Sequence, residues 1–480
     1  MIRFLLNEQL VSLDDCSPDT TVLEYLRTIA EQRGTKEGCA SGDCGACTAV
    51  IAEPHEGRLH YSNVNSCITF LGSLHGKQLL TVEHLQQSGE LHPVQQAMVA
   101  LHGSQCGFCT PGFIMSMFAL YKNNDHPTRS DVERGLAGNL CRCTGYRPII
   151  DAALSLAGKG SVDQFSGQEN TTLERLTTLI SETPTGQLTY RDRHFFVPTT
   201  SNELAKLLQS YPDAKLVAGG TDLALSVTQQ LQQPEVLIYT GRVAELLTLS
   251  DDVSCLSIGA GVSYTEAEPL LHRYFPAFAD LLERLGSLQV RNQGTLGGNV
   301  ANASPIGDTP PVLLALNAVL HVRTGDQCQA IGIDDFFLGY RQTALPKGGF
   351  IERIEIPKLT NQTLSVFKVS KRLDDDISAV CAAFALEIHE GVVRSARLGF
   401  GGMAATPARA INAEQALVGQ PFTEQGIQAA QQALAQDFQP INDVRATGEY
   451  RLMVAQNLLL RAVYEQGLQA PEALEVVQYA

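Results

Sequence analysis

The stretch Cys39-Ala40-Ser41-Gly42-Asp43-Cys44-Gly45-Ala46-Cys47 decides how the first part of this chain folds. Its three cysteines are spaced by four and then two residues, and Cys67 follows further along the chain. The glycines of this loop let backbone N–H groups approach a densely negative group, because glycine has no Cβ and tolerates positive φ. Four thiolates gathered around one loop predict an inorganic centre at this point.

The spacing of these four cysteines distinguishes between three kinds of site. The C-x4-C-x2-C pattern with a distant fourth cysteine is typical of plant-type 2Fe-2S centres. Structural zinc sites favour paired short spacings, which this loop does not have. A disulfide framework requires an oxidising compartment. We therefore expect a 2Fe-2S cluster on Cys39, Cys44, Cys47 and Cys67, with a zinc site as the alternative.

A second quartet of cysteines follows as Cys106-x2-Cys109 and Cys141-x1-Cys143. Thr110-Pro111, directly after the first pair, predicts a helix start, because threonine is favoured at the cap and proline in the first turn. The positive end of that helix dipole would stabilise thiolate charge. A thioredoxin-like redox pair is the alternative for the first two cysteines, but no βαβ pattern precedes them and a second pair follows. We expect this quartet to hold a second cluster.

The composition limits the possible partners and the compartment. The 480 residues carry 35 Lys+Arg and 51 Asp+Glu, a formal net charge of −16 that would repel nucleic acids and anionic membrane surfaces. No apolar run approaches the ~20 residues that span a bilayer, and the N-terminus lacks a signal or transit pattern. We expect a soluble, cytoplasmic protein with no nucleic-acid or membrane partner. The cysteines outside the quartets, Cys16, Cys255, Cys328 and Cys381, are expected to be small core residues.

Periodicity and turn residues predict an α+β multidomain protein. Residues 1–80 combine short alternating strands with one helix and predict a small β-grasp domain. Helix starts near Pro93, Pro111, Ser130 and Ile149 predict a four-helix domain over 81–157. Residues 158–190 contain many turn formers and predict a linker. Two larger α+β units follow at 191–364 and 365–480, with strands expected at 215–218, 236–239, 256–258, 319–322, 350–356, 380–388 and 393–400.

Five stretches of the chain together resemble the xanthine oxidase family of molybdenum hydroxylases. They are Cys39–Cys47, Gln105–Gly112, Leu140–Pro148, Leu216–Leu223 and Gly294–Asn299. The resemblance implies a plant-type 2Fe-2S ferredoxin domain at 1–80 and a helical 2Fe-2S-binding domain at 81–157. It also implies an FAD-binding domain at 191–364 and a C-terminal flavoprotein domain at 365–480.

Two glycine-rich loops carry the expected flavin site. Gly219-Gly220-Thr221 follows an expected strand and offers backbone N–H groups and a hydroxyl to a pyrophosphate, although such turns are also common without a ligand. Gly297-Gly298-Asn299 offers a second close backbone approach. The resemblance assigns cofactor contacts to Leu216, Val217, Ala218, Gly219, Gly220, Thr221, Asp222, Leu223, Thr295, Leu296, Gly297, Gly298, Asn299, Asp308, Ile351 and Lys368.

The resemblance also assigns two residues that face the reaction partners of the cofactors. Asp375 matches an acidic position near the flavin that influences reactivity with NAD, although the run Asp374–Asp376 also fits a solvated charge cluster. Tyr264 replaces the third glycine of a dinucleotide fingerprint that begins at Gly259, so we expect NAD to dock at the flavin. Gln105 matches a residue that faces the pterin of the molybdenum cofactor, with an ordinary surface amide as the alternative.

The function that the resemblance implies is electron transfer. A separate molybdenum-binding large subunit would oxidise hypoxanthine or xanthine in purine catabolism, in an assembly expected to be a dimer of heterodimers. Electrons would pass through the second quartet's cluster and then the first, to FAD and finally to NAD, because clusters carry single electrons and a flavin links them to hydride chemistry. The alternatives are the same subunit of a molybdenum hydroxylase for an aldehyde or aromatic substrate, or a non-enzymatic iron-sulfur electron carrier. The two flavin loops argue against the carrier.

Overall fold

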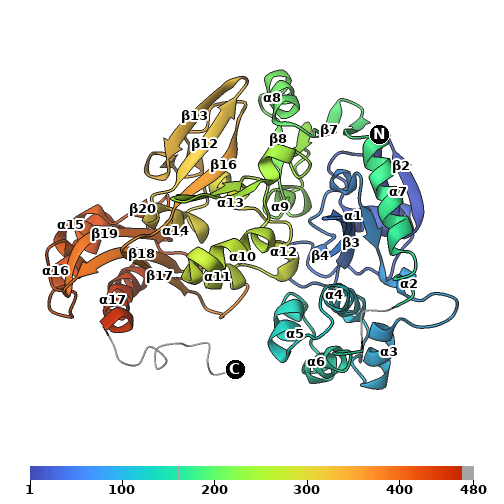
Figure 1. The fold of residues 1–480 in the computed structure, drawn as a ribbon, viewed down its shortest axis with the longest axis horizontal. Coiled ribbons are helices and arrows are strands. Elements are labelled where there is room, and N and C mark those ends of the chain that lie inside the picture. The colour runs from blue at the N-terminus through green and yellow to red at the C-terminus, as the bar shows by residue number, and fades with distance from the viewer. Residues whose placement is uncertain (160–162, 468–480) are drawn as a thin grey trace. The chain divides into compact units, whose positions relative to one another are not determined.

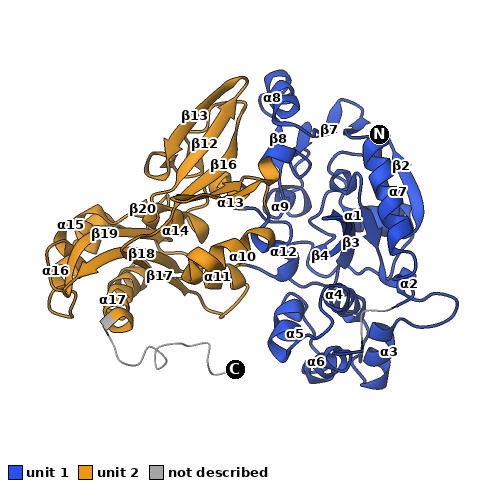
Figure 2. Ribbon diagram, in the orientation of Figure 1, with its two compact units in different colours: residues 1–245, 263–265, 286–295 blue, residues 246–262, 266–285, 296–480 orange. Residues whose placement is uncertain are grey.

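The computed structural model describes residues 1–159 and 163–467 and confirms a multidomain α+β protein (Figure 1). Its residues group into two compact units (Figure 2). Unit 1 contains Met1–Glu245, Ser263–Thr265 and Gly286–Thr295. Unit 2 contains Leu246–Val262, Glu266–Leu285 and the described residues from Leu296 onward. The chain passes between the units more than once, so segments distant in sequence share a unit.

Unit 1 begins with a mixed sheet in which the strand order is β2-β1-β5-β3-β4. β1 pairs with β5 in parallel, whereas β1–β2, β3–β4 and β3–β5 are antiparallel, the arrangement of a β-grasp domain. The strands are β1 (Ile2–Leu6), β2 (Gln9–Leu13), β3 (Thr48–His55), β4 (Arg58–Asn65) and β5 (Gln78–Leu80). The short helices are α1 (Val22–Glu24), η1 (Tyr25–Ile29), η2 (Leu71–Leu74) and α2 (Val82–Leu85).

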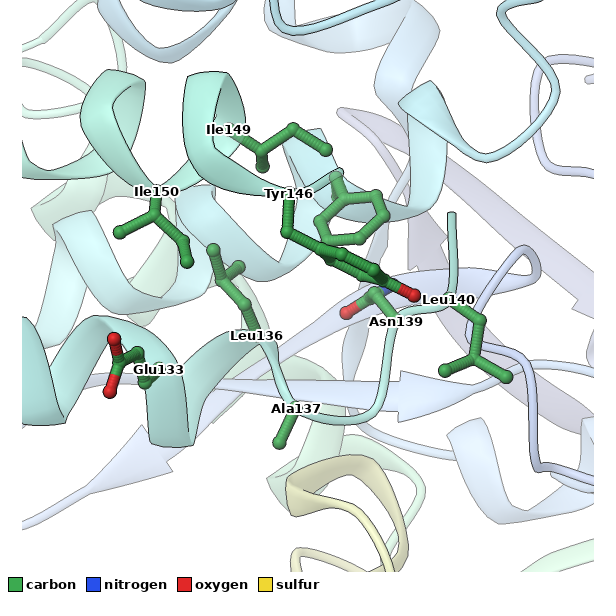
Figure 3. Close-up of a pocket in the computed structure, with 9 residues that line it drawn as sticks. Glu133, Leu136, Ala137, Asn139, Leu140, Tyr146, Ile149 and Ile150 are labelled. Carbon is green, nitrogen blue, oxygen red and sulfur yellow. The ribbon is translucent and has the colours of Figure 1, made fainter. Parts of the chain in front are cut away.

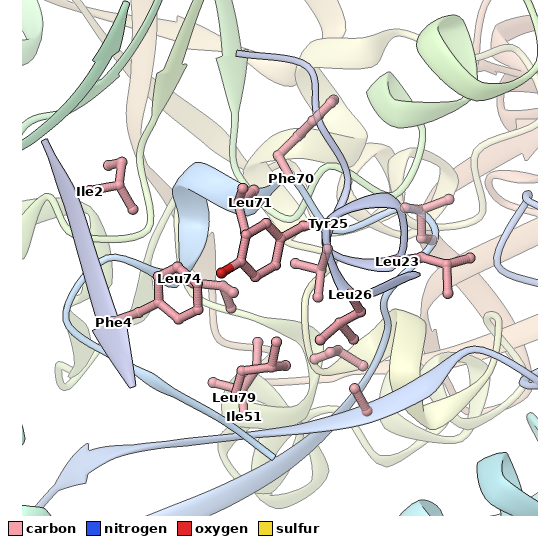
Figure 4. Close-up of a cluster of buried hydrophobic side chains, with 14 of the residues drawn as sticks. Ile2, Phe4, Leu23, Tyr25, Leu26, Ile51, Phe70, Leu71, Leu74 and Leu79 are labelled. Carbon is pink, nitrogen blue, oxygen red and sulfur yellow. The ribbon is translucent and has the colours of Figure 1, made fainter. Parts of the chain in front are cut away.

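The strand β1 buries side chains on both faces of this sheet. On β1, Ile2 and Phe4 enter one hydrophobic core with Leu26 and Leu71 (Figure 4). The neighbouring residue Leu5 enters a second core that it shares with the helical domain. Successive strand residues point to opposite faces of a sheet, so this division follows from the pleat. The loop that carries the first quartet therefore leads into β3, a strand held from both sides.

Four helices follow the sheet, as the sequence predicts: α3 (Pro93–Ala100), α4 (Thr110–Asn123), α5 (Arg129–Leu136) and α6 (Arg147–Leu154). The start of α5 differs from the predicted one. Thr128 Oγ1 accepts a hydrogen bond from the Asp131 amide at 3.2 Å, and Asp131 Oδ2 accepts one from the Thr128 amide at 2.9 Å. This reciprocal pair caps the helix. Ser130 consequently lies inside the helix rather than at its cap.

The last sheet of unit 1 has the strand order β6-β7-β9-β8. β7, β9 and β8 run parallel, so the helix between β7 and β8 is a crossover connection. Residues 158–190, expected to be a linker, contain a helix and the first strand of this sheet. The elements are α7 (Glu169–Glu182), β6 (Gly186–Tyr190), β7 (Arg193–Val197), α8 (Ser201–Ser210), β8 (Lys215–Val217), α9 (Leu223–Thr228), β9 (Val236–Tyr239), η3 (Ala244–Leu247) and, later in the chain, α12 (Leu288–Arg291).

Unit 2 holds a five-stranded sheet, β10-β11-β16-β12-β13, and a four-stranded sheet, β17-β18-β19-β20. The strands are β10 (Leu249–Asp251), β11 (Cys255–Gly259), β12 (Val319–Thr324), β13 (Gln327–Gly332), β14 (Phe337–Gly339), β15 (Gln342–Thr343), β16 (Gly349–Pro357), β17 (Gln362–Val369), β18 (Val380–His389), β19 (Val392–Gly401) and β20 (Ala408–Arg409). The helices are α10 (Tyr264–Tyr274), α11 (Pro276–Glu283), α13 (Leu296–Asn302), α14 (Thr309–Ala315), η4 (Ile333–Asp335), α15 (Ile411–Leu417), α16 (Gln428–Asp437) and α17 (Gly448–Gly467). No helix in residues 1–159 or 163–467 combines the length and apolar character needed to cross a membrane.

The four cysteines outside the quartets differ in exposure. Cys16 and Cys381 are buried, as predicted. Cys255 is half-buried. The prediction of a core position is wrong for Cys328, which is exposed on β13. β13 is an edge strand whose first four residues are all open to solvent, so neither face of the strand there is covered.

Candidate iron-sulfur and flavin sites

The structure brings the four thiols of the first quartet together. Three of them lie on the loop between η1 and β3, and Cys67 follows β4. The sulfurs of Cys47 and Cys67 are 3.3 Å apart. Cys39 makes side-chain hydrogen bonds with Cys44 and Cys67. The chain folds this way locally because Gly38 passes so close to Cys44 that a Cβ on it would lie 2.8 Å from the Cys44 sulfur.

The protonation of these thiols shows what the site requires. Hydrogen bonds from neighbouring thiols lower the pKa of Cys39 and of Cys47, because a donated proton stabilises the thiolate. The same contacts raise the pKa of Cys44 and of Cys67. A hydrogen bond that stabilises one thiolate of the quartet therefore keeps a proton on its neighbour. Bound iron would supply the positive charge that lets all four ionise, so the donor set fits a cluster.

Side chains of the first domain hold the loop in place. Asn65 Nδ2 donates to the Gly42 carbonyl at 2.7 Å, and Ser66 Oγ donates to the Cys47 carbonyl at 2.6 Å. The backbone N–H of Ser41 lies 3.5 Å from the Cys39 sulfur. Sequence reasoning did not single out Asn65 or Ser66, although both stand just before Cys67. Their proximity to a ligand was the only sequence signal available.

The structure also brings the second quartet together, as two hydrogen-bonded pairs. The free thiol of Cys109 is hydrogen-bonded to that of Cys141, and the free thiol of Cys106 is hydrogen-bonded to that of Cys143. Cys109 directly precedes α4, where burial and the contact with Cys141 raise the pKa of its thiol to about 12. Burial also opposes ionisation of Cys141, but hydrogen bonds outweigh it and lower the pKa of this thiol. The largest of these contributions comes from Thr144, whose Oγ1 lies 3.2 Å from the Cys141 sulfur. Cys106 and Cys143 are exposed, so this quartet reaches the protein surface.

An apolar pocket of about 220 Å³ lies beside the second quartet (Figure 3). Its lining comes from α4, α5, α6 and the segment before Cys141: Phe113, Glu133, Leu136, Ala137, Asn139, Leu140, Tyr146, Ile149 and Ile150. Tyr146 Oη accepts a hydrogen bond from the Cys141 amide at 3.0 Å, so the pocket wall is tied to a predicted ligand. Gln105 is exposed next to Cys106.

Hydrogen bonds connect the two chain segments that carry the quartets. The Leu140 amide donates to the Cys44 carbonyl at 3.0 Å, and Asn139 Nδ2 donates to the Gly45 carbonyl at 3.0 Å. No group of three or more His, Cys, Asp or Glu side chains within residues 1–159 and 163–467 is arranged around one metal ion. A 2Fe-2S cluster shares its four thiolates between two irons, so the quartets do not require such a group.

The first flavin loop belongs to unit 1 and lies against the first quartet's domain. Leu216 and Val217 end β8, Ala218 to Asp222 form the turn, and Leu223 begins α9. A Cβ on Gly219 would lie 1.9 Å from the Gln293 carbonyl oxygen, and Gly220 adopts φ +75°. Both positions therefore require glycine.

Two further contacts join this loop region to the first quartet. A Cβ on Gly220 would lie 3.3 Å from the carbonyl oxygen of Ile68, the residue after Cys67. Gln229, which follows α9, donates from Nε2 to the carbonyl oxygens of Cys39 at 3.3 Å and Ala40 at 3.0 Å. Thr295, the other predicted flavin residue of unit 1, is buried and forms an isolated bridge with Ser263.

The remaining predicted flavin residues belong to unit 2. Leu296 to Asn299 form the first turn of α13. A Cβ on Gly297 would lie 2.5 Å from the Ala260 Cβ, so this position also requires glycine. Asn299 Oδ1 accepts a hydrogen bond from Thr309 at 2.6 Å, and Ile351 is buried on β16.

Asp308 and Lys368, both predicted flavin residues, form a buried ion pair. Lys368 Nζ lies 2.5 Å from Asp308 Oδ2, and the two side chains are 2% and 7% exposed. Ser378 donates to the other carboxylate oxygen of Asp308 at 2.5 Å. The sequence does not mark Ser378 as a site residue, because no motif surrounds it. The two opposite charges cancel, so this buried site carries no net charge.

Asp375 occupies the loop between β17 and β18 with φ +53°. Arg372 donates to its backbone carbonyl at 3.4 Å. Its neighbours have structural partners: Asp374 lies 3.8 Å from Arg284, and Asp376 accepts from the Arg372 amide at 2.9 Å. That backbone hydrogen bond is the main reason why the pKa of Asp376 is lowered.

Four family models match the chain in succession. The 2Fe-2S iron-sulfur cluster binding domain matches residues 5–72, and the 2Fe-2S binding domain matches 81–154. The FAD binding domain in molybdopterin dehydrogenase matches 189–359, and the CO dehydrogenase flavoprotein C-terminal domain matches 365–466. Each cysteine quartet falls within one iron-sulfur model, and both glycine loops fall within the FAD model.

Individual proteins extend these matches. Xanthine dehydrogenase of Emericella nidulans is 36% identical over 496 residues, covering 91% of this chain and 36% of its own length. The chain thus spans about a third of that curated relative. Carbon monoxide dehydrogenase from Hydrogenophaga pseudoflava has a TM-score of 0.54 at 28% identity, over 56% of this chain and 94% of the matched one. Quinoline 2-oxidoreductase from Pseudomonas putida 86 has a TM-score of 0.53 at 27% identity, over 56% and 96%. With iron-sulfur, FAD-binding and flavoprotein domains in this order, the chain belongs to the xanthine oxidase family of molybdenum hydroxylases, as its iron-sulfur and FAD-binding portion.

Proposed function

We propose that this chain is the electron-transfer subunit of a cytoplasmic xanthine dehydrogenase. A molybdenum-binding large subunit is the proposed partner, in a dimer of heterodimers, and it oxidises hypoxanthine or xanthine. The proposed electron acceptor is NAD. In this role the chain holds and spaces the cofactors, and the chemistry on the purine takes place outside it.

When bound, the cofactors would supply the redox chemistry: 2Fe-2S clusters exchange single electrons, whereas FAD exchanges single electrons and also a hydride. The chain's own residues hold them. The first quartet would grip one cluster on a loop stiffened by Asn65 and Ser66, and the second would grip another at the start of α4. The backbone around Gly219 would approach the pyrophosphate of FAD, because no side chain obstructs it there.

The single observation that carries the proposal is the sequence of contacts within unit 1. The second quartet reaches the first through Leu140 and Cys44, whose backbones share a hydrogen bond. The first quartet reaches the flavin loop through Ile68 and Gly220. A surface-exposed quartet at one end and a flavin loop at the other suit one-electron transfer inward from a partner subunit. A non-enzymatic carrier would have no use for the flavin end of this series.

The identity of the substrate is supported by the relatives. The chain is 36% identical to a xanthine dehydrogenase along 91% of its length, whereas the solved carbon monoxide and quinoline enzymes match 56% of it. Those two structures favour the second candidate, the corresponding portion of a molybdenum hydroxylase with another substrate. NAD as acceptor is supported by the match of Asp375 to an acidic position near the flavin, at a partly exposed site between β17 and β18.

The test is to purify the chain with the protein that accompanies it and to identify that protein. The complex is expected to reduce NAD with xanthine, and NADH alone is expected to bleach the flavin absorbance. Activity with a quinoline or an aldehyde but not with xanthine would favour the second candidate. A flavin that NADH does not bleach would contradict NAD as acceptor, and a chain that binds no flavin would favour the simple electron carrier.

A further inference from the structure

One short segment of unit 1, Ser287–Thr295, contacts all three of the proposed cofactor regions in that unit. It contains α12 and ends at the second flavin loop. At its start, a Cβ on Gly138 would lie 2.4 Å from the Ser287 Cβ and 2.2 Å from Gln289 Oε1. The segment therefore packs directly on the residues that precede Cys141.

Gln289 lies at the centre of a buried polar network. Its side chain is fully buried, and Nε2 lies within hydrogen-bond distance of Thr48 Oγ1 at 3.1 Å, Asn139 Oδ1 at 3.0 Å and Ser116 Oγ at 3.3 Å. Thr48 follows Cys47, Asn139 stands two residues before Cys141, and Ser116 lies on α4. The carboxamide of Gln289 thus contacts residues next to the cysteines of both quartets.

The partners of Gln289 continue the network to the cluster loop itself. Asn139 Nδ2 donates to the Gly45 carbonyl at 3.0 Å, and Thr48 Oγ1 donates to the same carbonyl at 2.7 Å. Ser116 Oγ donates to Asn139 Oδ1 at 2.6 Å. Thr48, Ser116 and Asn139 are each at most 2% exposed. Thr48 Oγ1 also accepts from Asn139 Nδ2 at 3.2 Å, and Ser116 Oγ also accepts from Asn63 Nδ2 at 3.3 Å. Removing Gln289 therefore leaves each buried acceptor one donor but takes away the single group that joins all three, so the hydrogen bonds between them would rearrange.

The end of the segment extends the contacts to the flavin loop. Asn292 Nδ2 donates to Asn63 Oδ1 at 2.7 Å on β4, and Gln293 Oε1 accepts from Thr69 at 3.0 Å. The Gln293 carbonyl is the group that a Cβ on Gly219 would strike. The segment is therefore held against the backbone of the first flavin loop and against the domain that carries the first quartet.

We propose that Gln289 is a positioning residue that sets the spacing of the two iron-sulfur clusters. Its carboxamide holds Asn139 and Thr48 in register on the shared Gly45 carbonyl, and so fixes where the second quartet sits relative to the first. The inference rests on the proposed function only in that both clusters must be present. It adds that a residue from the flavin-domain part of the sequence controls coupling between clusters it does not ligate.

The experiment compares Gln289→Met with Gln78→Met in the purified chain carrying its clusters. Methionine keeps the length of the side chain and removes the donor. Gln78 is a matched control, since it is 5% exposed on β5 and donates to the Asn7 carbonyl at 2.7 Å, outside the network. The first readout is the magnetic interaction between the two reduced clusters in electron spin resonance, which falls with the cube of their separation. The second is hydrogen exchange of the Leu140 amide.

Gln289→Met is expected to change the magnetic interaction and to accelerate Leu140 exchange by about tenfold or more, while Gln78→Met leaves both as in the wild type. If Gln289→Met does not accumulate as folded protein, Ser116→Ala replaces it. This variant should also change the magnetic interaction and accelerate exchange of the Leu140 amide. Two unchanged readouts would overturn the proposal. A wild-type chain without cluster signals would overturn the proposed function instead, so the two failures are distinguishable.

Discussion

The amide nitrogen of Leu140 lies 3.0 Å from the carbonyl oxygen of Cys44 and donates a hydrogen bond to it. Leu140 precedes Cys141 of the second quartet, and Cys44 belongs to the first. Because the bond joins backbone atoms, it forms whatever the side chain of Leu140 is, and it holds two predicted ligand loops from separate domains in one arrangement. A series of single-electron centres depends on such fixed spacing.

Replacing Cys143 by Ser is expected to remove the second cluster's signal in electron spin resonance and to keep the first. Cys143 is exposed and pairs with Cys106, away from the first quartet. Reduction of NAD by xanthine should be lost, while dye reduction by NADH survives, because that reaction needs only the flavin end. Cys328→Ser, at an exposed position outside both quartets, is the control. Loss of both activities together in Cys143→Ser would contradict the electron order.

Gly219→Ala tests the first flavin loop. The added methyl would lie 1.9 Å from the Gln293 carbonyl oxygen, so backbone must move, and the free energy of unfolding should fall by about 1–3 kcal/mol or more. Flavin absorbance per chain should fall as well. Gly167→Ala is the control, since nothing lies within 4 Å of its Cβ position. Full flavin occupancy in Gly219→Ala would argue against this loop as a cofactor contact.

Lys368→Met should be strongly destabilising, because it leaves the Asp308 carboxylate buried without its cation. The expected loss in urea unfolding is about 3–5 kcal/mol. The double variant Asp308→Asn with Lys368→Met should recover part of it, since no unpaired charge is then left. Arg129→Met breaks the exposed pair with Glu133 and should cost less than about 1 kcal/mol. Equal losses for the buried and exposed pairs would refute this account of the Asp308 pair.

His75 makes the stability of unit 1 depend on pH. Burial is the main cause that lowers the pKa of its imidazole to about 4. Its Nδ1 accepts from the Arg3 amide at 3.1 Å, and Nε2 donates to the Thr183 carbonyl at 2.8 Å, an arrangement that needs the neutral ring.

The unfolded imidazole has a pKa of about 6.5, so between about pH 6.5 and 4 the unfolded chain binds a proton that the folded chain does not. The contribution of His75 is therefore complete above pH 6.5 and is lost as the pH falls, by about 2 kcal/mol at pH 5. In urea unfolding, the free energy of unfolding of His75→Gln should fall less between pH 7 and pH 5 than that of the wild type. His126→Gln, at an exposed position, is the control. Parallel profiles for His75→Gln and the wild type would show that this histidine does not contribute.

Local signals made much of the fold predictable from sequence. The α+β class and the four helices after the first sheet were expected from periodicity and helix-start residues, and the strands expected at 236–239 and 380–388 are β9 and β18. The sequence predicts the cap of α5 two residues too late, because Thr128 and Ser130 each have an acidic residue three positions later. Only the backbone decides which of two such pairs forms the box.

The spacing of the cysteines was enough to group the two quartets, which the structure brings together. The network around Gln289 could not be anticipated. Its members, Thr48, Ser116, Asn139 and Gln289, are common polar residues scattered over the sequence, and nothing local marks any of them as buried. Their role exists only once three separate segments meet.

The most direct test of the central claim is elemental and cofactor analysis of the purified chain. The account predicts iron and acid-labile sulfide in equal amounts, at two clusters per chain, together with bound FAD. Zinc in place of iron, or iron without acid-labile sulfide, would contradict it.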